Sequence, residues 1–150
     1  MISPSLDSLL KLSEKLNAQP IYFLMDRESG PMQKMVINPT ERQEVHPPNI
    51  KNSEVKLELL VSDTLNRRME PYMLTFRKGK SVEGHFYPHK GDEFAYVIEG
   101  EMEFEIQEEK HLLKKGDSLY LGSTFPSKWA NIGMGDATLL WIVSPPRGAW

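Results

Sequence analysis

The chain has 150 residues, of which 39% are hydrophobic, so it can form one ordinary domain with a real core and a short appendage. Eighteen basic residues against twenty-one acidic ones give a formal net charge of -3, which excludes nucleic-acid binding driven by overall charge. Cysteine is absent, which excludes disulfides and thiol chemistry, and without a membrane-length apolar run or a signal peptide the sequence predicts a soluble, cytoplasmic protein with no membrane partner.

The first predicted element is a short N-terminal helix. Ser3 and Pro4 suit its N-cap and first helical position. Its apolar face is formed mostly by leucines, namely Leu6, Leu9, Leu10 and Leu16. A second short helix is predicted to begin at Pro20, with the sequence PIYFLM. The charged stretch that follows contains Gly30 and Pro31 and is typical of a linker.

After the linker, the apolar period changes from helical to two, which indicates strands with one buried face. The predicted strands cover 54–61, 72–76, the segment EGEMEFEIQ at 99–107, the segment LLKKGDSLYLG at 112–122 and the segment ATLLWIVSP at 137–145. Polar turns separate these strands, and no helix-length insert interrupts them. This pattern favours a mainly β, antiparallel sandwich or barrel.

A polar cluster is predicted around the segment HFYPHKGDE. On an extended strand, Tyr87 and His89 point the same way, and Glu93 can rejoin them after the KGD turn. A phenol, an imidazole and a carboxylate converging in a barrel mouth suit a polar ligand or a metal. Alternatively, His89 and Glu93 simply pair to satisfy one another in the core. His85 is expected to be a surface histidine at a strand start.

Two glycine-bounded segments carry a family resemblance. HKGDEFAYVIEG, from His89 to Gly100, resembles the first cupin motif, and GDSLYLGSTFPSKWAN, from Gly116 to Asn131, resembles the second. The resemblance implies a cupin fold, a double-stranded β-helix or jelly-roll barrel, with a short N-terminal helical segment. It also implies a homodimer formed through the sheet edges.

In metal-binding cupins, the two motifs supply three histidines and one glutamate. By that resemblance, His89 matches the second histidine and Glu93 the glutamate, whereas Tyr87 and Ser127 replace the other two histidines. Loss of two imidazoles is expected to cost most of the metal affinity, so we predict no metal and no cofactor. His85 could substitute for the first histidine, because it has the parity of Tyr87.

The opening SPSLDSLLKLSEKLNAQPIYFL resembles the closing helices of an Xre-type helix-turn-helix domain. In many bacterial regulators, such a domain is followed by a linker and a cupin. The resemblance implies a helical remnant at 1–25, a linker at 26–35 and a cupin domain at 36–150. The helices that enter the major groove are expected before residue 1, so DNA contact is expected only through helices outside this chain. The alternative is a plain helical arm packed on the barrel.

The sequence therefore favours a transcriptional regulator's sensor domain that binds a small-molecule effector over an enzyme that turns over a substrate. The predicted polar ligand contacts are Tyr87, His89, Glu93 and Ser127. The predicted apolar wall contains Met73, Phe104 and Trp129. Such a cavity suits a ligand with polar or cationic groups better than a lipid. Two alternatives remain: a metal-dependent cupin enzyme of dioxygenase or isomerase type, and a cupin with a structural or partner-binding role.

Overall fold

The computed structural model describes residues 6–16, 34–47, 50, 54–62, 67–86, 91–122 and 124–146. The chain divides into two compact units, Met1–Gln33 and Lys34–Trp150, which we describe separately. The predicted linker 26–35 and cupin start at 36 stay predictions. Among the described residues, no helix has the length and apolar character to cross a membrane.

The first unit contains the helix α1, Leu6–Leu16, which confirms the predicted N-terminal helix. Asp7 in its first turn forms an exposed ion pair with Lys11 at 2.8 Å, a contact that adds only a few tenths of a kcal/mol. The hydroxyl of Ser13, which is buried, donates to the carbonyl of Leu9 at 2.7 Å. The predicted Ser3 cap and the predicted second helix at Pro20 lie outside the described residues.

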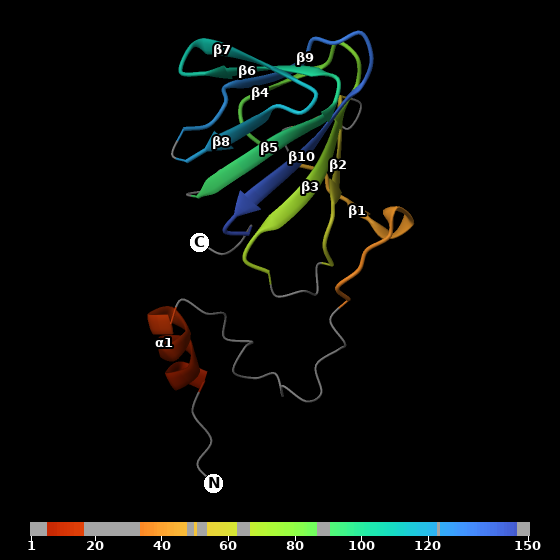
Figure 1. Ribbon diagram of the computed structural model, residues 1–150. Helices are drawn as coiled ribbons and strands as arrows, with labels where there is room; N and C mark the ends of the chain where they lie inside the picture. The colour runs from red at the N-terminus through yellow and green to blue at the C-terminus, as the bar shows by residue number, and fades with distance from the viewer. Residues whose placement is uncertain are drawn as a thin grey trace. The chain divides into compact units, whose positions relative to one another are not determined.

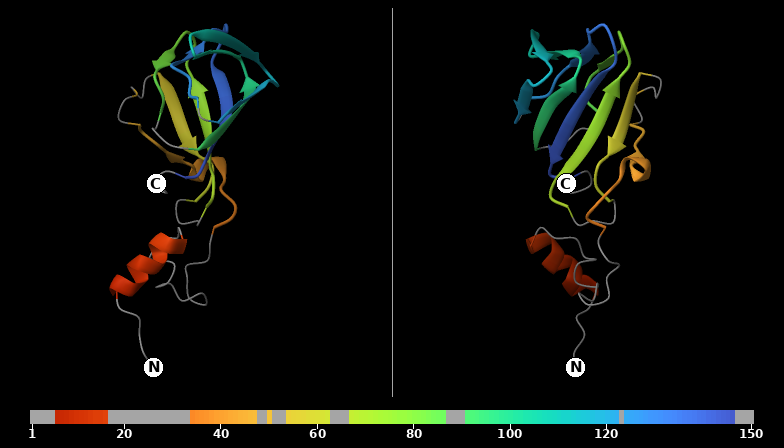
Figure 2. Two further views of the ribbon diagram at one scale, coloured as in Figure 1. Left: turned by 90° about the vertical axis from the view of Figure 1, so that its left-hand side faces the viewer. Right: turned by 45° about the vertical axis from the view of Figure 1, so that its right-hand side comes forward.

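The second unit is built of antiparallel strands in two sheets, so the mainly β prediction is confirmed. After the short 3-10 helix η2 (Pro39–Glu41), the elements are β1 (Gln43–Glu44), β2 (Val55–Leu59), β3 (Glu70–Phe76), β4 (Ser81–Glu83), β5 (Asp92–Glu99), β6 (Glu101–Ile106), β7 (Glu109–Lys114), β8 (Ser118–Leu121), β9 (Lys128–Asn131) and β10 (Ala137–Ser144). The six-stranded sheet has the order β1-β2-β3-β10-β5-β8, and the four-stranded sheet has the order β4-β9-β6-β7. Figures 1 and 2 show these two layers facing each other.

Each central strand has one inner and one outer face because successive side chains point to opposite sides. In β3 and β10, alternate residues are buried along the whole strand. The register places Tyr72, Trp141 and Ala95 side by side across β3, β10 and β5, and all three are buried. The strands predicted from period-two alternation at 54–61, 72–76 and 137–145 are therefore confirmed, with shifts of a few residues at their ends.

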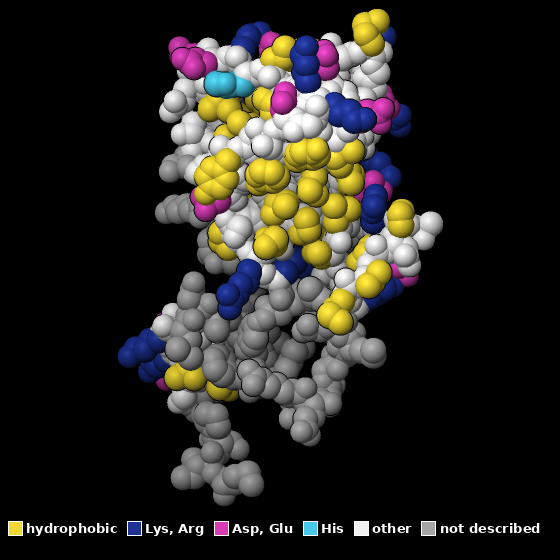
Figure 3. Space-filling view, viewed as in Figure 1, with side chains coloured by type: hydrophobic (Ala, Val, Ile, Leu, Met, Phe, Trp, Pro, Cys, Tyr) yellow, Lys and Arg dark blue, Asp and Glu magenta, His cyan; other side chains and the backbone are white. Residues whose placement is uncertain are grey.

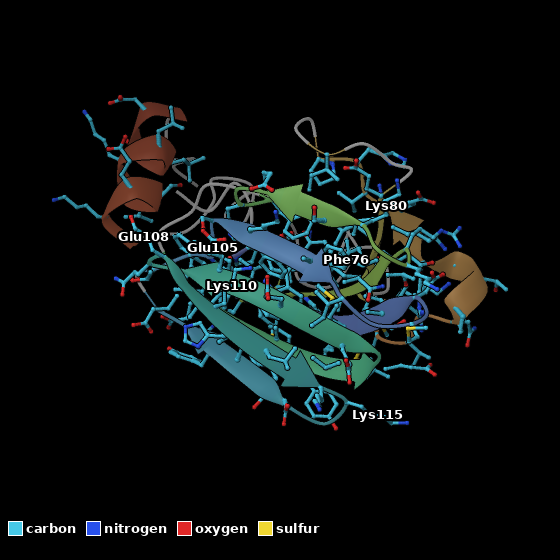
Figure 4. All side chains as sticks on the ribbon, turned by 90° about the horizontal axis from the view of Figure 1, so that it is seen from above. Phe76, Lys80, Glu105, Glu108, Lys110 and Lys115 are labelled. Atoms are coloured by element: carbon cyan, nitrogen blue, oxygen red, sulfur yellow. The ribbon has the colours of Figure 1, made fainter. Side chains whose placement is uncertain are left out.

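The core lies between the two sheets, and aromatic side chains form a large part of it. Phe76 from the six-stranded sheet and Phe104 from the four-stranded sheet are both fully buried. Figure 4 looks along this interior from above, with Phe76 labelled and with Glu108 and Lys115 marking the two ends of β7. The tight turn before β7 has positive φ at Gln107 and Glu108. This conformation lets β6 and β7 form a hairpin with a two-residue loop.

A buried amide ties the two sheets together near one end of the core. The side chain of Asn131 in β9 donates to the carbonyls of Phe76 and Gly135, at 3.1 and 2.8 Å. Its oxygen accepts from the backbone N–H of Gly133 at 3.0 Å. The amide thus satisfies backbone groups that leave the ladder where β3 ends and where the loop into β10 begins, as buried polar groups require.

Candidate functional site

Glu93 is the centre of the candidate site. It lies in β5 on the inner face of the six-stranded sheet, and 1% of its surface is exposed. One carboxylate oxygen accepts from the indole N–H of Trp141 at 2.9 Å, and the other lies 2.5 Å from Nε2 of His85. A buried carboxylate is costly unless polar partners surround it. Here Trp141 supplies a hydrogen bond and His85 a close N···O contact.

The His85 ring lies among aromatic rings. It stacks on Phe125, with ring centroids 4.6 Å apart and planes at 22°. The centroids of Trp129, Trp141 and Phe86 lie 6.1, 6.0 and 6.5 Å from it. Only 12% of the His85 side chain is exposed, so the expectation of a surface histidine is wrong. The chain turns at Gly84, directly after β4, where φ is 79°. This turn brings His85 into contact with Glu93 on another strand.

The apolar wall differs in one residue from the prediction. Phe104 and Trp129 are fully buried, with ring centroids 5.0 Å apart. The prediction that Met73 belongs to the wall is wrong, because the side chains of Tyr72 and Leu74 in β3 point inward and that of Met73 points outward. The indole N–H of Trp129 has no hydrogen-bond partner among the residues that the structure describes. A buried donor of this kind is available to a ligand or a water molecule.

A second buried carboxylate lies on the same inner row as Glu93. Glu70 in β3 and Glu93 in β5 both pair with Val143 in β10, one from each side. Glu70 accepts from Nη2 and Nε of Arg67 at 2.6 and 3.1 Å, and its other oxygen accepts from the Tyr72 hydroxyl at 2.8 Å. Each inner carboxylate therefore has its own donors.

The four predicted ligand contacts are placed differently. Tyr87 and His89 lie outside the described residues. Glu93 lies in the barrel interior, as above. Ser127 is exposed, and its hydroxyl donates to the carbonyl of Glu105 at 3.2 Å. Ligand contact by any of the four stays a prediction, as does the alternative that His89 pairs with Glu93.

A metal-ligand set is not assembled by the described part of the chain. No group of three or more His, Cys, Asp or Glu side chains comes together among the described residues. His85 and Glu93 are one imidazole and one carboxylate in contact, which is fewer ligands than a tight divalent-metal site needs. The prediction of no metal and no cofactor is not tested by this geometry, because His89 lies outside it.

Three residues of the site were not predicted from the sequence, namely Glu70, Arg67 and Trp141. A signal was present for Glu70, because counting back by two from Tyr72 places it on the inner face of its strand. Trp141 has inward parity in the same way, but period two does not reveal a hydrogen bond to a residue 48 positions away. Arg67 lies before β3 and carries no periodic signal.

The chain is similar in sequence to a known protein family and to a known regulator. A family model described as Cupin domain matches residues 72–143. The HTH-type transcriptional regulator PuuR of Escherichia coli (strain K12) is 23% identical over 144 residues, covering 96% of this chain and 75% of PuuR.

Two solved structures illustrate the range of proteins with this fold. The cupin domain of an XRE family transcriptional regulator from Enterobacter cloacae has a TM-score of 0.52 and 21% identity, covering 62% of this chain and 98% of its own. The polyketide cyclase RemF from Streptomyces resistomycificus has a TM-score of 0.62 and 18% identity, covering 78% of this chain and 82% of its own. At these identities the structures show a shared fold alone. Residues 72–143 of this chain therefore match the cupin family model, the chain shares the fold of solved cupins, and its sequence is similar to that of an HTH-type transcriptional regulator.

Proposed function

We propose that the chain is the effector-binding part of a bacterial transcriptional regulator, with a small molecule bound inside the barrel beside Glu93. The observation that carries the proposal is the buried Glu93 carboxylate, held by His85 and Trp141 within an aromatic interior. Replacing a buried ionic group by apolar side chains is often neutral or stabilising, so stability alone gives no reason to keep one. Ligand recognition gives such a reason.

The relationship to PuuR and to the XRE family regulator supports the regulatory part of this proposal. In the proposal, the protein works in the cytoplasm, and DNA is contacted by helix-turn-helix domains of the kind named for PuuR. Effector binding would bias how two DNA-binding domains are held, which requires the effector to prefer one arrangement. The buried carboxylate supports an effector with a polar or cationic group.

The first prediction concerns effector binding. A thermal-shift panel of small amines, amino acids, carboxylates and fatty acids is expected to contain stabilising compounds among those with a polar or cationic group. A ligand at a hundred times its Kd adds about 2.7 kcal/mol to the free energy of unfolding. The same compound is expected to lose most of this effect with Glu93→Gln and to keep it with Glu99→Gln, an exposed glutamate of the same strand. A compound that stabilises Glu93→Gln and Glu99→Gln equally would show that it binds away from Glu93.

A metal-dependent cupin enzyme is the second candidate, because His85 and Glu93 are in contact inside the barrel and RemF shares the fold. Elemental analysis of protein purified without chelator or affinity-column metal separates the two candidates. Stoichiometric metal that disappears in His89→Ala, together with turnover of a substrate, would support the enzyme. Metal below stoichiometry would leave the effector-binding proposal in place.

The outer face of the six-stranded sheet supports a homodimer. Side chains of β3, β10 and β5 cover this face with apolar groups, which gather over these strands in Figure 3. Leu140 lies near its centre, opposite Met73 on one side and Tyr96 on the other. At the neighbouring strand β8, a hydrogen bond with the Asp92 side chain raises the pKa of Tyr120 above its usual value. Apart from Asp92 at the start of β5, the face is largely apolar and can pack against its own copy about a twofold axis.

The second prediction tests this surface. We expect the wild-type chain to be a dimer and Leu140→Glu to raise the dimer dissociation constant about 30-fold or more, because an unpaired charge would be buried at the interface. Sedimentation velocity over a range of concentrations measures the change. The matched control is Leu112→Glu, at an exposed leucine of the edge strand β7. A monomeric wild type would contradict the proposed dimer. Loss of the dimer in Leu112→Glu alone would place the dimer interface at the sheet edge and not on the outer face of the six-stranded sheet.

A further inference from the structure

We infer that the His85 imidazole fills the position at which the cationic head group of a ligand binds. The effector is accordingly an organic cation with a compact nitrogen-bearing head. The inference deepens the proposed function and rests on it. It starts from the observation that aromatic rings and a carboxylate surround the His85 imidazole. Phe125 stacks on that ring, Trp129 and Trp141 flank it, and Glu93 contacts its Nε2.

The chemistry of these groups is that of a cation-binding cage. The faces of aromatic rings attract cations whose centre lies within about 6 Å of the ring centroid, and tryptophan does so most strongly. Phe125 presents its face to the His85 ring, with centroids 4.6 Å apart and planes at 22°. Trp129 and Trp141 lie at the limit of this range, at 6.1 and 6.0 Å, with planes at 32° and 87°. A buried carboxylate at one side then orients an N–H group of the ligand. A neutral apolar ligand would leave Glu93 with one donor fewer.

The cage and its occupant are held differently by the fold. Glu93, Trp141 and Trp129 belong to β5, β10 and β9, whose ladders fix the positions of their side chains. His85 follows β4 and belongs to no strand, because the strand ends at Glu83 and Gly84 has a positive φ. The His85 side chain is also 12% exposed, whereas Glu93 is fully enclosed. Strands therefore hold three of the four groups around the ring, whereas Phe125, like His85, lies in a loop. His85 is the part that a ligand can replace, because it fills the centre of the group.

The relation between His85 and the ligand is a competition. A cation that enters the cage takes over the contacts of the imidazole with Glu93 and with the flanking rings. Its binding free energy is reduced by the free energy of releasing His85, as for any site whose competent state is only partly populated. Removing the imidazole should therefore raise the affinity of the site for small cations.

The experiment uses imidazolium as the probe, in the full chain carrying His85→Ala. We expect imidazolium to stabilise this variant against heat and to bind it at least about 10-fold more tightly than the wild type by calorimetry. His111→Ala, at an exposed histidine of β7, is the matched control and is expected to behave as the wild type. Adding Glu93→Gln to His85→Ala is expected to abolish the gain. Furan, a neutral ring of similar size, is expected to give little stabilisation.

Two results would overturn the inference. One is a folded His85→Ala protein that binds imidazolium no better than His111→Ala, and the other is binding that survives Glu93→Gln. Should His85→Ala fail to fold, the wild type still provides a test. A small cation should then shift the NMR ring resonances of His85 and leave those of His111 unchanged, and absence of that shift at saturation contradicts displacement. A stabilising compound from the effector panel combined with either negative result would reject the cage and leave effector binding intact.

Discussion

Glu93→Ala is expected to lower the free energy of unfolding by about 3 kcal/mol, because it removes one partner from a buried, hydrogen-bonded cluster. The indole N–H of Trp141 would lose its acceptor at 2.9 Å, and Nε2 of His85 would lose the carboxylate. Truncation also leaves a cavity among residues with almost no exposed surface. Urea denaturation followed by tryptophan fluorescence measures the loss, provided that the slope with urea concentration is unchanged.

Two control variants separate the contributions to this loss. Glu93→Gln keeps the shape and one acceptor oxygen, so it is expected to cost less than the alanine variant. Glu99→Ala removes an exposed glutamate from the same strand and is expected to change stability by less than about 0.5 kcal/mol. If Glu93→Ala were as stable as Glu99→Ala, the carboxylate would not be a structural element of the core, and its burial would need another explanation.

Much of the fold was predictable because its central strands follow a simple rule, whereas the segment predicted as a strand at 112–122 is divided between β7 and β8, which lie in different sheets. Where one face of a strand is buried and the other faces water, apolar residues recur with period two, as Met102 and Phe104 do in β6. The short strands β4 and β9 were not predicted individually. Each has three or four residues, which is too few for a periodic signal, and only their pairing with each other and with β6 defines them.

The candidate site was predictable only in part. Glu93 was found because it lies in a recognisable motif at inward parity. The environment of His85 was not predictable, because its neighbours Phe125, Trp129 and Trp141 are 40 or more residues away in sequence and meet it only after both sheets have formed. Met73 was misplaced for the opposite reason: its apolar character suggested an inner position, although the parity of β3 assigns it to the outer face. Hydrophobicity at a single position does not decide the face when both faces of a strand are apolar.

Arg67→Ala is expected to lower the free energy of unfolding by about 2 to 3 kcal/mol, because it leaves the Glu70 carboxylate buried without its cation. Arg67 contacts one oxygen of Glu70 through both Nη2 and Nε, and its Nη1 donates to the carbonyl of Ser62. The expected cost lies at or below the lower end for buried pairs because the Arg67 side chain is 17% exposed, so solvent screens part of the interaction that is lost. Arg68→Ala, at the exposed neighbouring arginine, is the matched control.

The double variant Arg67→Met with Glu70→Met shows whether the pair serves stability or binding. Replacing both charges by apolar side chains of similar volume removes the need for a counter-charge, so the double variant is expected to be much more stable than Arg67→Ala. Tyr72 would still lose the acceptor for its hydroxyl, at 2.8 Å from Glu70, which limits the recovery. A double variant that is as stable as the wild type but binds the effector more weakly would extend the binding site across Val143 to Glu70. Unchanged binding would confine the site to Glu93 and the rings around His85.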